Sequence, residues 1–219
     1  MPTERHPFEP FLPPGARILF LGSFPPQPHR WCMPFYYPNW INDFWRIMGL
    51  IHFCDRDRFC LPAEKRFDEA AIRSFCTREG LAFYDTVCEV RRLKDNAPDA
   101  FLEVVTPTDV RVLLRQIPLC DTLVTTGQKA TEVVAATFGC EVPPVGGCID
   151  LKVDMAECAA VGGRKIDVAK SMEAGEDQTS GDGKILTVRT VRFWRMPSTS
   201  RAYPLPLEKK ADAYRRLFR

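Results

Sequence analysis

Aromatic side chains crowd around the carboxamide of Asn42 in the segment FYYPNWINDFW, residues 35–45. A carboxamide offers both a hydrogen-bond donor and an acceptor, so Asn42 could orient a water molecule or hold a heterocycle. Flat rings provide surfaces on which a nucleobase can stack, and Phe35, Tyr36 and Tyr37 are all candidates, with core packing as the alternative role. Asn42 also suits the N-cap of the helix that follows, and one residue can serve both purposes. The segment therefore predicts one wall of a nucleobase pocket.

A second segment, LGSFPP at residues 21–26, follows the apolar run Ile18–Leu21. A short apolar run before a glycine is typical of a buried strand that ends in a sharp turn. Open α/β sheets place their ligand crevices at such strand ends. Gly22 would let the backbone approach a ligand closely, and the Ser23 hydroxyl suits a phosphate contact as well as an ordinary turn.

Two carboxylates accompany these segments. Asp43 follows Asn42, where the helix dipole favours an acid, and it is a reserve candidate for a general base. Asp85 ends the apolar run Leu81–Tyr84. An ionised carboxylate only accepts hydrogen bonds, so Asp85 would prefer a base edge rich in N–H groups, or it could activate water. Capping of a turn is an equally open interpretation of Asp85.

Positive charge is concentrated near the C-terminus. Residues 184–219 hold ten Lys and Arg against two acids, a net charge of +8, and because the whole chain carries +2, the remainder carries −6. A basic segment of this kind is a candidate phosphate-binding face, and a solvated charged helix is the alternative. Within it, Ser198 offers a small hydroxyl on a turn.

The elements that position these residues alternate between strand and helix. The expected strands are residues 18–21, 81–84, 121–126 and 185–196. The expected helices are residues 42–49, 63–78 and 107–116, a helix after Gly127, and 207–218. This alternation predicts an α/β fold with a mostly parallel sheet, as a single domain over residues 1–219. An extended arm is expected over 1–15 and an irregular excursion, which could contain a hairpin, over 143–182.

The bulk composition is that of a globular protein, with 219 residues, 45% hydrophobic and 26% charged. No apolar run approaches the roughly 20 residues needed to cross a bilayer, and the N-terminus carries charge and proline where a signal peptide would be apolar. A cytoplasmic location is therefore expected. The nine cysteines form no CxxC pair, which favours reduced thiols; an iron–sulfur cluster, with help from His6, His29 or His52, remains the alternative.

Together, these segments resemble the uracil-DNA glycosylase superfamily, most closely its hypoxanthine-type and mismatch-specific branches. LGSFPP at 21–26 with FYYPNWINDFW at 35–45 is similar to the family's glycine turn and its aromatic–Asn–x–Phe–Trp continuation. GLAFYDTV at 80–87 is similar to the strand that ends in a base-reading residue, and MPSTSRAYPL at 196–205 to the closing loop. A weaker likeness is TTGQKA at 125–130. The likenesses follow the family's order over nearly the whole chain.

The resemblance implies a three-layer α/β/α fold and a set of site residues. The implied catalytic residues are Asn42, Asp85 and, in reserve, Asp43. The implied base-binding residues are Tyr37, Phe24, Asp85 and Gly22. The implied DNA-binding residues are Ser23, Ser198, Thr199, Ser200, Arg201 and Tyr203, of which Arg201 and Tyr203 would enter the DNA.

The sequence also departs from the family pattern. Phe24 stands where most branches have an Asp or Asn that activates water, although the hypoxanthine-type branch also lacks a polar residue there and depends on the Asn that matches Asn42. Asn39 and Trp40 replace a frequent His-Pro, and Arg201 replaces a frequent Pro. These differences concern the substrate base more than the fold.

The resemblance therefore implies a monofunctional DNA glycosylase that removes hypoxanthine or uracil and needs no metal or cofactor. Its expected partner is DNA with a damaged or mismatched base, with no membrane, and a monomer is expected. One alternative is a catalytically weak nucleic-acid-binding module of the same fold. Another is a nucleoside or nucleotide hydrolase that uses the same crevice.

Overall fold

A computed structural model describes residues 2–93, 101–155, 177–179 and 185–218 of the chain. Its centre is a six-stranded sheet in which four strands, β11, β8, β2 and β5, run parallel in that order. The parallel strands are β2 (Ile18–Gly22), β5 (Leu81–Asp85), β8 (Thr122–Thr125) and β11 (Ile185–Arg195). Two further strands, β9 (Cys148–Asp154) and β10 (Asp177–Thr179), pair antiparallel with β11. The predicted mostly parallel sheet is confirmed.

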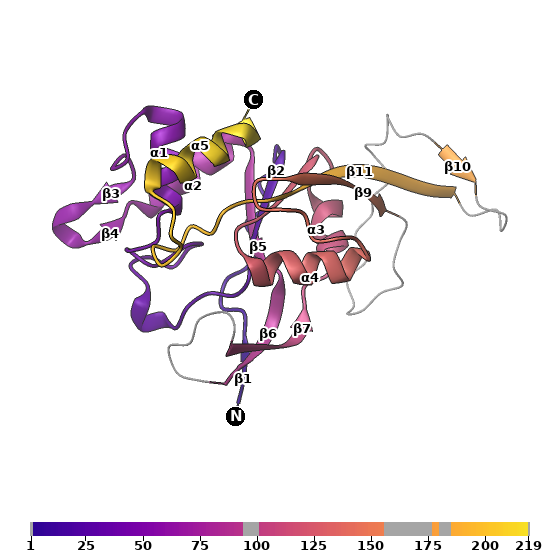
Figure 1. Cartoon of the computed structure of the whole chain (residues 1–219), viewed down its shortest axis with the longest axis horizontal. Coiled ribbons are helices and arrows are strands. Elements are labelled where there is room, and N and C mark those ends of the chain that lie inside the picture. Colours follow the sequence, from indigo (N-terminus) through magenta and orange to yellow (C-terminus); the bar gives the residue numbers. More distant parts are fainter. Residues whose placement is uncertain (1, 94–100, 156–176, 180–184, 219) are drawn as a thin grey trace.

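Helices cover both faces of this sheet, which confirms the predicted three layers. In β2, Ile18 and Phe20 point into one core while Leu19 and Leu21 point into the other, as the two-residue period of a strand requires. One face carries α1 (Phe44–Phe53), α2 (Glu69–Glu79) and α5 (Leu207–Tyr214), and the other carries α3 (Val110–Gln116) and α4 (Gln128–Phe138). Figure 1 shows these two groups of helices on opposite sides of the strands.

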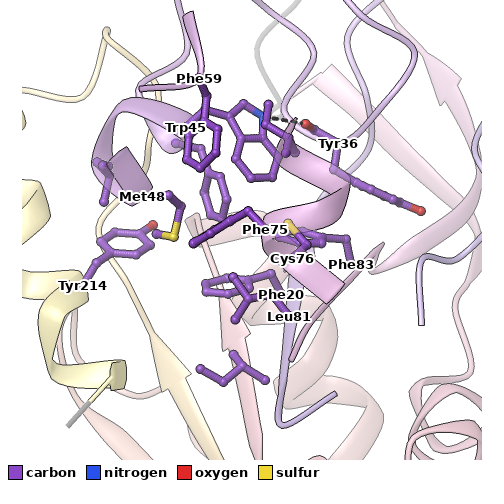
Figure 2. Close-up of a cluster of buried hydrophobic side chains, with 14 of the residues drawn as sticks. Phe20, Tyr36, Trp45, Met48, Phe59, Phe75, Cys76, Leu81, Phe83 and Tyr214 are labelled. Carbon is purple, nitrogen blue, oxygen red and sulfur yellow. Dashed lines mark hydrogen bonds between the residues drawn. The ribbon is translucent and has the colours of Figure 1, made fainter. Parts of the chain in front are cut away.

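The two cores differ in chemistry. The core under α1, α2 and α5 is rich in aromatic rings, including Phe20, Phe83 and Trp45, which Figure 2 shows closely packed. The Trp45 indole N–H donates to the carbonyl of Tyr36 at 3.0 Å, so the buried ring keeps its hydrogen bond. The core under α3 and α4 is mainly aliphatic, with Leu114 and Leu123 fully buried. The aromatic core thus lies directly beneath the segment that was predicted to form the pocket wall.

Helix α2 begins later than expected. The sequence predicted a helix from residue 63, but the chain first forms the 3-10 turn η2 (Pro62–Glu64) and a short hairpin of β3 (Cys60–Leu61) and β4 (Arg66–Phe67). The side chain of Asp68 accepts a hydrogen bond from the Ala71 amide and caps the helix there. An N-cap carboxylate of this kind pairs an amide that would otherwise lack an intrahelical partner, which favours a helix start at this residue.

The ends of other helices also differ by a few residues from those expected from the sequence. Helix α3 begins at Val110 because Asp109 caps it, and α1 begins at Phe44. The last expected helix is α5 followed by the 3-10 turn η4 (Arg215–Phe218), and another 3-10 turn, η1, covers Pro28–Arg30.

A second, smaller sheet was not predicted. It consists of β1 (Thr3–Arg5), β6 (Val87–Arg92) and β7 (Leu102–Pro107), joined antiparallel with β6 in the middle. The predicted extended arm therefore supplies a strand, which pairs with a segment more than eighty residues away. Figure 1 places this sheet at one end of the molecule, near the N-terminus.

Residues 143–182 contain more regular structure than the predicted irregular excursion. Strands β9 and β10 both lie in this range and pair with β11. Cross-strand pairing with a long neighbour gives β9 its extended form, a non-local effect that the glycine-rich sequence conceals. Residues 156–176 and 180–182 lie outside the described residues.

Among the described residues, no helix has both the length and the apolar character needed to span a bilayer. The eight cysteines of the described residues are free thiols. Burial raises the pKa of the Cys60 thiol and of the Cys120 thiol to about 11, which keeps both protonated near neutral pH.

Candidate active site

A cavity of about 420 Å³ opens where the four parallel strands end. Strand β2 ends at Gly22, β5 at Asp85 and β8 at Thr125, while the loop after β11 lies opposite them. In open parallel sheets the ligand binds at the carboxyl ends of the strands. It lies at the topological switch point, where the chain leaves two neighbouring strands toward opposite sides of the sheet. Here that point lies between β2 and β8. The volume falls within the range of small-molecule sites, about 300–1,000 Å³.

The cavity brings together most of the predicted site residues. Those that line it are Ser23, Phe24, Tyr37, Asn42, Asp85, Ser198, Thr199, Ser200 and Arg201. Gly22, Asp43 and Tyr203 are not among the lining residues. Three segments that are far apart in the sequence therefore meet at one site.

Asp85 is a buried carboxylate held from two sides. Its Oδ2 lies 2.9 Å from Nε2 of His6, whose side chain is only 2% exposed. Its Oδ1 lies over Gly22, where an added Cβ would stand 2.5 Å from that oxygen. The register of β2 and β5 places the two residues directly opposite each other. Gly22 thus makes room for the carboxylate of Asp85, a different role from the expected approach of the backbone to a ligand.

The Tyr37 ring is held in a defined position. Its ring stacks on Phe44 with the centroids 3.9 Å apart and the planes at 4°. Its hydroxyl is hydrogen-bonded to Thr126 Oγ1 at 2.9 Å, and burial raises the pKa of the phenol well above its usual range. The backbone φ of Tyr37 is 51°, a left-handed conformation that costs a non-glycine residue on the order of 1 kcal/mol. The surrounding contacts therefore hold this ring in place against local strain.

Asn42 is oriented by the helix that it precedes. Its Oδ1 accepts a hydrogen bond from the Phe44 amide at 2.9 Å, as expected for a capping role, although Asp43 occupies the N-cap position itself. Arg46 donates to the backbone carbonyls of Trp40 and Asn42 at 2.8 and 3.1 Å and lies over the Trp40 ring. Burial lowers the pKa of this guanidinium. The loop that carries Asn42 is thereby tied to the body of α1.

Asp43 lies behind the cavity wall in a buried ion pair. Its Oδ2 accepts from Lys210 Nζ at 2.8 Å, and Oδ1 is 3.4 Å from Nε of Arg201. Lys210 also donates to the Ser200 carbonyl at 2.8 Å, and the Asp43 amide donates to the Thr199 carbonyl at 2.9 Å. Asp43 and Lys210 therefore fasten the start of α1 to the loop after β11.

The loop after β11 presents hydroxyls and one cation to the cavity. Ser198 Oγ accepts from the Ser200 amide at 3.2 Å, and Ser200 Oγ accepts from the Ala202 amide at 3.2 Å. Arg201 is exposed and lines the cavity, whereas Tyr203 lies beyond its rim.

Phe24 lines the opposite wall. It is buried and packs edge-on against the His6 ring, with the centroids 5.4 Å apart.

The basic residues of β11 do not reach this cavity. Arg189 donates to the carbonyls of Pro118 and Leu114, and Arg195 to that of Pro143. Arg192 lines a separate groove at the opposite end of the sheet. Of the described basic residues in the C-terminal segment, only Arg201 therefore lines the cavity.

The sequence did not reveal four residues that shape this site: His6, Thr126, Arg46 and Lys210. The position of Thr126 directly before Gly127 was a usable signal, because it is the residue that follows β8. In the sequence, Lys210 looks like an ordinary charged residue of a solvated helix. Only its burial, at 1% exposure, shows that it belongs to the ion pair with Asp43. His6 had been considered only as a possible metal ligand.

The fold is similar to that of the solution NMR structure of a "putative Uracil DNA glycosylase" from Methanosarcina acetivorans. The TM-score is 0.55, with 16% sequence identity, and the match covers 99% of each chain. No protein-family model and no curated protein matches the chain. The similarity concerns the fold, and it agrees with the predicted α/β architecture over the full length.

Proposed function

We propose that this protein is a monofunctional DNA glycosylase that hydrolyses the N-glycosidic bond of a deaminated base, hypoxanthine or uracil, flipped out of DNA. The observation that carries the proposal is the convergence of Asp85, Tyr37 and Asn42 on one cavity beside a hydroxyl-rich loop with an exposed arginine. The fold similarity to the Methanosarcina protein named above supports the same class.

The carboxylate of Asp85 suits a deaminated base. Deamination converts the unprotonated ring nitrogen of cytosine or adenine into the N–H of uracil or hypoxanthine. A carboxylate accepts from such an N–H and repels the lone pair of the parent base. A site that leaves a buried polar group unpaired discriminates strongly, so cytosine and adenine should be rejected. Thymine and guanine also carry a ring N–H and are the informative control bases.

Tyr37 would stack the extruded base. Flipping costs a few kcal/mol of unstacking, which a glycosylase recovers through aromatic contact and hydrogen bonds to the base edge. One face of the Tyr37 ring rests on Phe44, so a base would use the other face. The strained backbone and the bond to Thr126 support a ring that is in position before substrate arrives.

Hydrolysis would proceed through an oxocarbenium-like sugar. The glycosidic electron pair leaves with the base, the oxygen of water bonds to C1′, and the water proton passes to the departing base. Asn42 would orient this water, since its capping bond to Phe44 fixes the carboxamide. The phosphates of the DNA help to neutralise the sugar cation. No lysine lines the cavity among the described residues, which supports hydrolysis without a Schiff base.

The loop after β11 would hold the DNA backbone. Ser198, Ser200 and Arg201, with Ser23 across the cavity, offer hydroxyl and guanidinium donors of the kind that contact phosphates. Salt-dependent DNA binding is the expected signature, because each neutralised phosphate releases counterions.

The test is alkaline cleavage of labelled duplexes that carry one hypoxanthine, uracil, xanthine, thymine or guanine at the same position. Wild type should excise hypoxanthine or uracil, and Asn42→Ala should reduce excision at least about tenfold if it orients the water. Gln116→Ala, an amide loss on the exposed surface of α3, is the matched control and should leave excision unchanged.

A catalytically weak binding module is the second candidate, favoured by one observation. Phe24 lines the cavity, and in the superfamily that the sequence resembles most branches have an acid or amide at this position. Salt-sensitive DNA binding without excision of any of these bases would support the binding module and contradict the glycosylase.

A further inference from the structure

The N-terminal arm delivers one imidazole to the cavity wall. His6 follows β1, and its backbone amide donates to the Cys88 carbonyl on β6 at 2.8 Å. Because β1 and β6 are in fixed register, with Arg5 opposite Glu89, the His6 side chain has a defined position. That position brings Nε2 within 2.9 Å of Asp85 Oδ2, across 79 residues of sequence.

The position of the His6 ring proton follows from the partners of both ring nitrogens. His6 Nδ1 lies 3.2 Å from the Phe8 amide and 2.9 Å from the Phe8 carbonyl. In the neutral ring with the proton on Nε2, Nδ1 accepts from the amide; in the charged ring, Nδ1–H donates to the carbonyl. A neutral ring with its proton on Nδ1 would point a lone pair at this carboxylate, so the forms that fit Asp85 are the two that present an Nε2–H to it.

Aromatic rings enclose the His6–Asp85 pair. The His6 ring lies 4.6 Å from Tyr84, 5.4 Å from Phe24 and 5.9 Å from Phe8, between ring centroids. Burial raises the pKa of the Tyr84 phenol well above its usual range, so this neighbour is neutral. Hydrogen bonds in such a water-poor setting are strong and their groups move little.

We propose that His6 is a positioning residue for Asp85, an inference that rests on the proposed glycosylase function. By engaging Oδ2, the imidazole fixes the plane of the carboxylate and leaves Oδ1, the oxygen over Gly22, to accept the ring N–H of the base. His6 is itself outside the cavity lining and acts only through Asp85. The N-terminal arm is therefore part of the base-recognition apparatus.

The test compares His6→Leu with His6→Gln. Glutamine spans a similar distance and can donate an N–H to Asp85, whereas leucine fills space without a donor. We expect His6→Leu to lower kcat/KM for the preferred base by about tenfold or more and His6→Gln to remain within about threefold of wild type. Arg5→Ala, on the exposed side of the same strand, is the control for docking of the arm.

A double variant separates positioning from packing. If His6 acts through Asp85, His6→Leu combined with Asp85→Ala should be no slower than Asp85→Ala alone. Additive losses, equal losses in His6→Leu and His6→Gln, or wild-type activity in His6→Leu would each overturn the inference. Melting curves of the folded variants confirm that the rates compare intact proteins.

An imidazole nitrogen spectrum tests the pairing without any activity. We expect the ¹⁵N spectrum of wild type to show a His6 ring protonated at Nε2, and this resonance to shift in Asp85→Ala. An unshifted resonance overturns the inference. A wild type that excises no base would refute the proposed function, and the imidazole spectrum would then still decide whether the His6–Asp85 pair exists.

Discussion

The two ends of the central sheet hold hollows of opposite character. At the amino ends of the parallel strands, a groove of about 950 Å³ is lined by charged side chains such as Arg17, Asp121 and Arg192. The Arg17–Asp121 ion pair there is 61% and 56% exposed. At the carboxyl ends, a cavity of less than half that volume has the buried pairs His6–Asp85 and, behind its wall, Lys210–Asp43.

This difference shows that the volume of a hollow alone does not indicate which end of the sheet is the better candidate for the site. Exposed ion pairs contribute little, because water already solvates both partners. Buried polar groups cost free energy unless each is paired, so a fold that keeps several of them at one place has a use for their fixed orientation. We therefore propose the smaller cavity as the site and regard the larger groove as a solvated surface.

Breaking an ion pair at each end gives the largest expected contrast. Lys210→Met should leave the Asp43 carboxylate buried with only the longer contact to Arg201, and should lower the free energy of unfolding by about 3 kcal/mol. Arg17→Met, which removes the exposed cation at the other end, should cost less than about 1 kcal/mol. Urea denaturation measures both values. Equal losses in the two variants would show that burial does not distinguish the ends.

Removing one carboxylate at each end of the sheet, Asp85 or Asp121, tests which end takes part in the reaction. Asp85→Ala should lower kcat/KM for the preferred base by roughly 100-fold, because loss of a charged hydrogen bond costs about 1.5–3 kcal/mol. Asp121→Ala, just before β8 at the opposite end, should change kcat/KM by less than about twofold. Single-turnover excision provides the rates. An Asp85→Ala protein with wild-type kinetics would remove this carboxylate from the account.

Adding one methyl group at Gly22 on β2 tests whether Asp85 on β5 needs its observed position. Gly22→Ala places a Cβ 2.5 Å from Asp85 Oδ1, so the carboxylate must move. We expect excision to fall by about tenfold with the fold intact, since a displaced Asp85 carboxylate loses its alignment with the base. Gly15→Ala meets nothing within 4 Å and is the matched control. Similar rates for the two variants would mean that Asp85 needs no fixed position.

The central layers of this fold were predictable because their signals are local. The run Ile18–Leu21 is apolar throughout and stops at Gly22, which is what a strand buried on both faces requires. The small sheet was not predictable, because β1 is only three residues long and is defined by its pairing with β6. Such pairing depends on contacts that no window of sequence contains.

The residues of the candidate site that the sequence singled out are those that interrupt regular patterns. Asn42 and Asp85 stand at the ends of apolar segments, where a polar side chain has a reason to be. His6 and Lys210 could not be found in this way, since an imidazole in a proline-rich arm and a lysine in a charged helix are ordinary features. Only tertiary structure shows that each is buried against a carboxylate.

The smallest expected effect is a pH dependence of stability that arises from His52, at the amino ends of the parallel strands. Burial lowers the pKa of His52, which lies 3.7 Å from Glu79, below its unfolded value of 6.5. The unfolded chain then binds the proton more readily than the folded protein. The free energy of unfolding should therefore fall as the pH drops from about 6.5 to the pKa of His52 in the folded protein. His52→Gln should flatten this dependence in urea midpoints between pH 7 and 5, and exposed His29→Gln should not. An unchanged slope in His52→Gln would contradict the burial of its charge.

The central claim is that the carboxyl end of the sheet receives the flipped base. The most direct measurement is a crystal structure of the protein with a duplex that carries 2′-fluoro-2′-deoxyinosine, whose fluorine slows cleavage of the glycosidic bond. The account predicts the hypoxanthine ring against Tyr37, with its ring N–H within hydrogen-bond distance of Asp85. A base that remains stacked in the duplex, or DNA bound across the groove at the amino end, would contradict it.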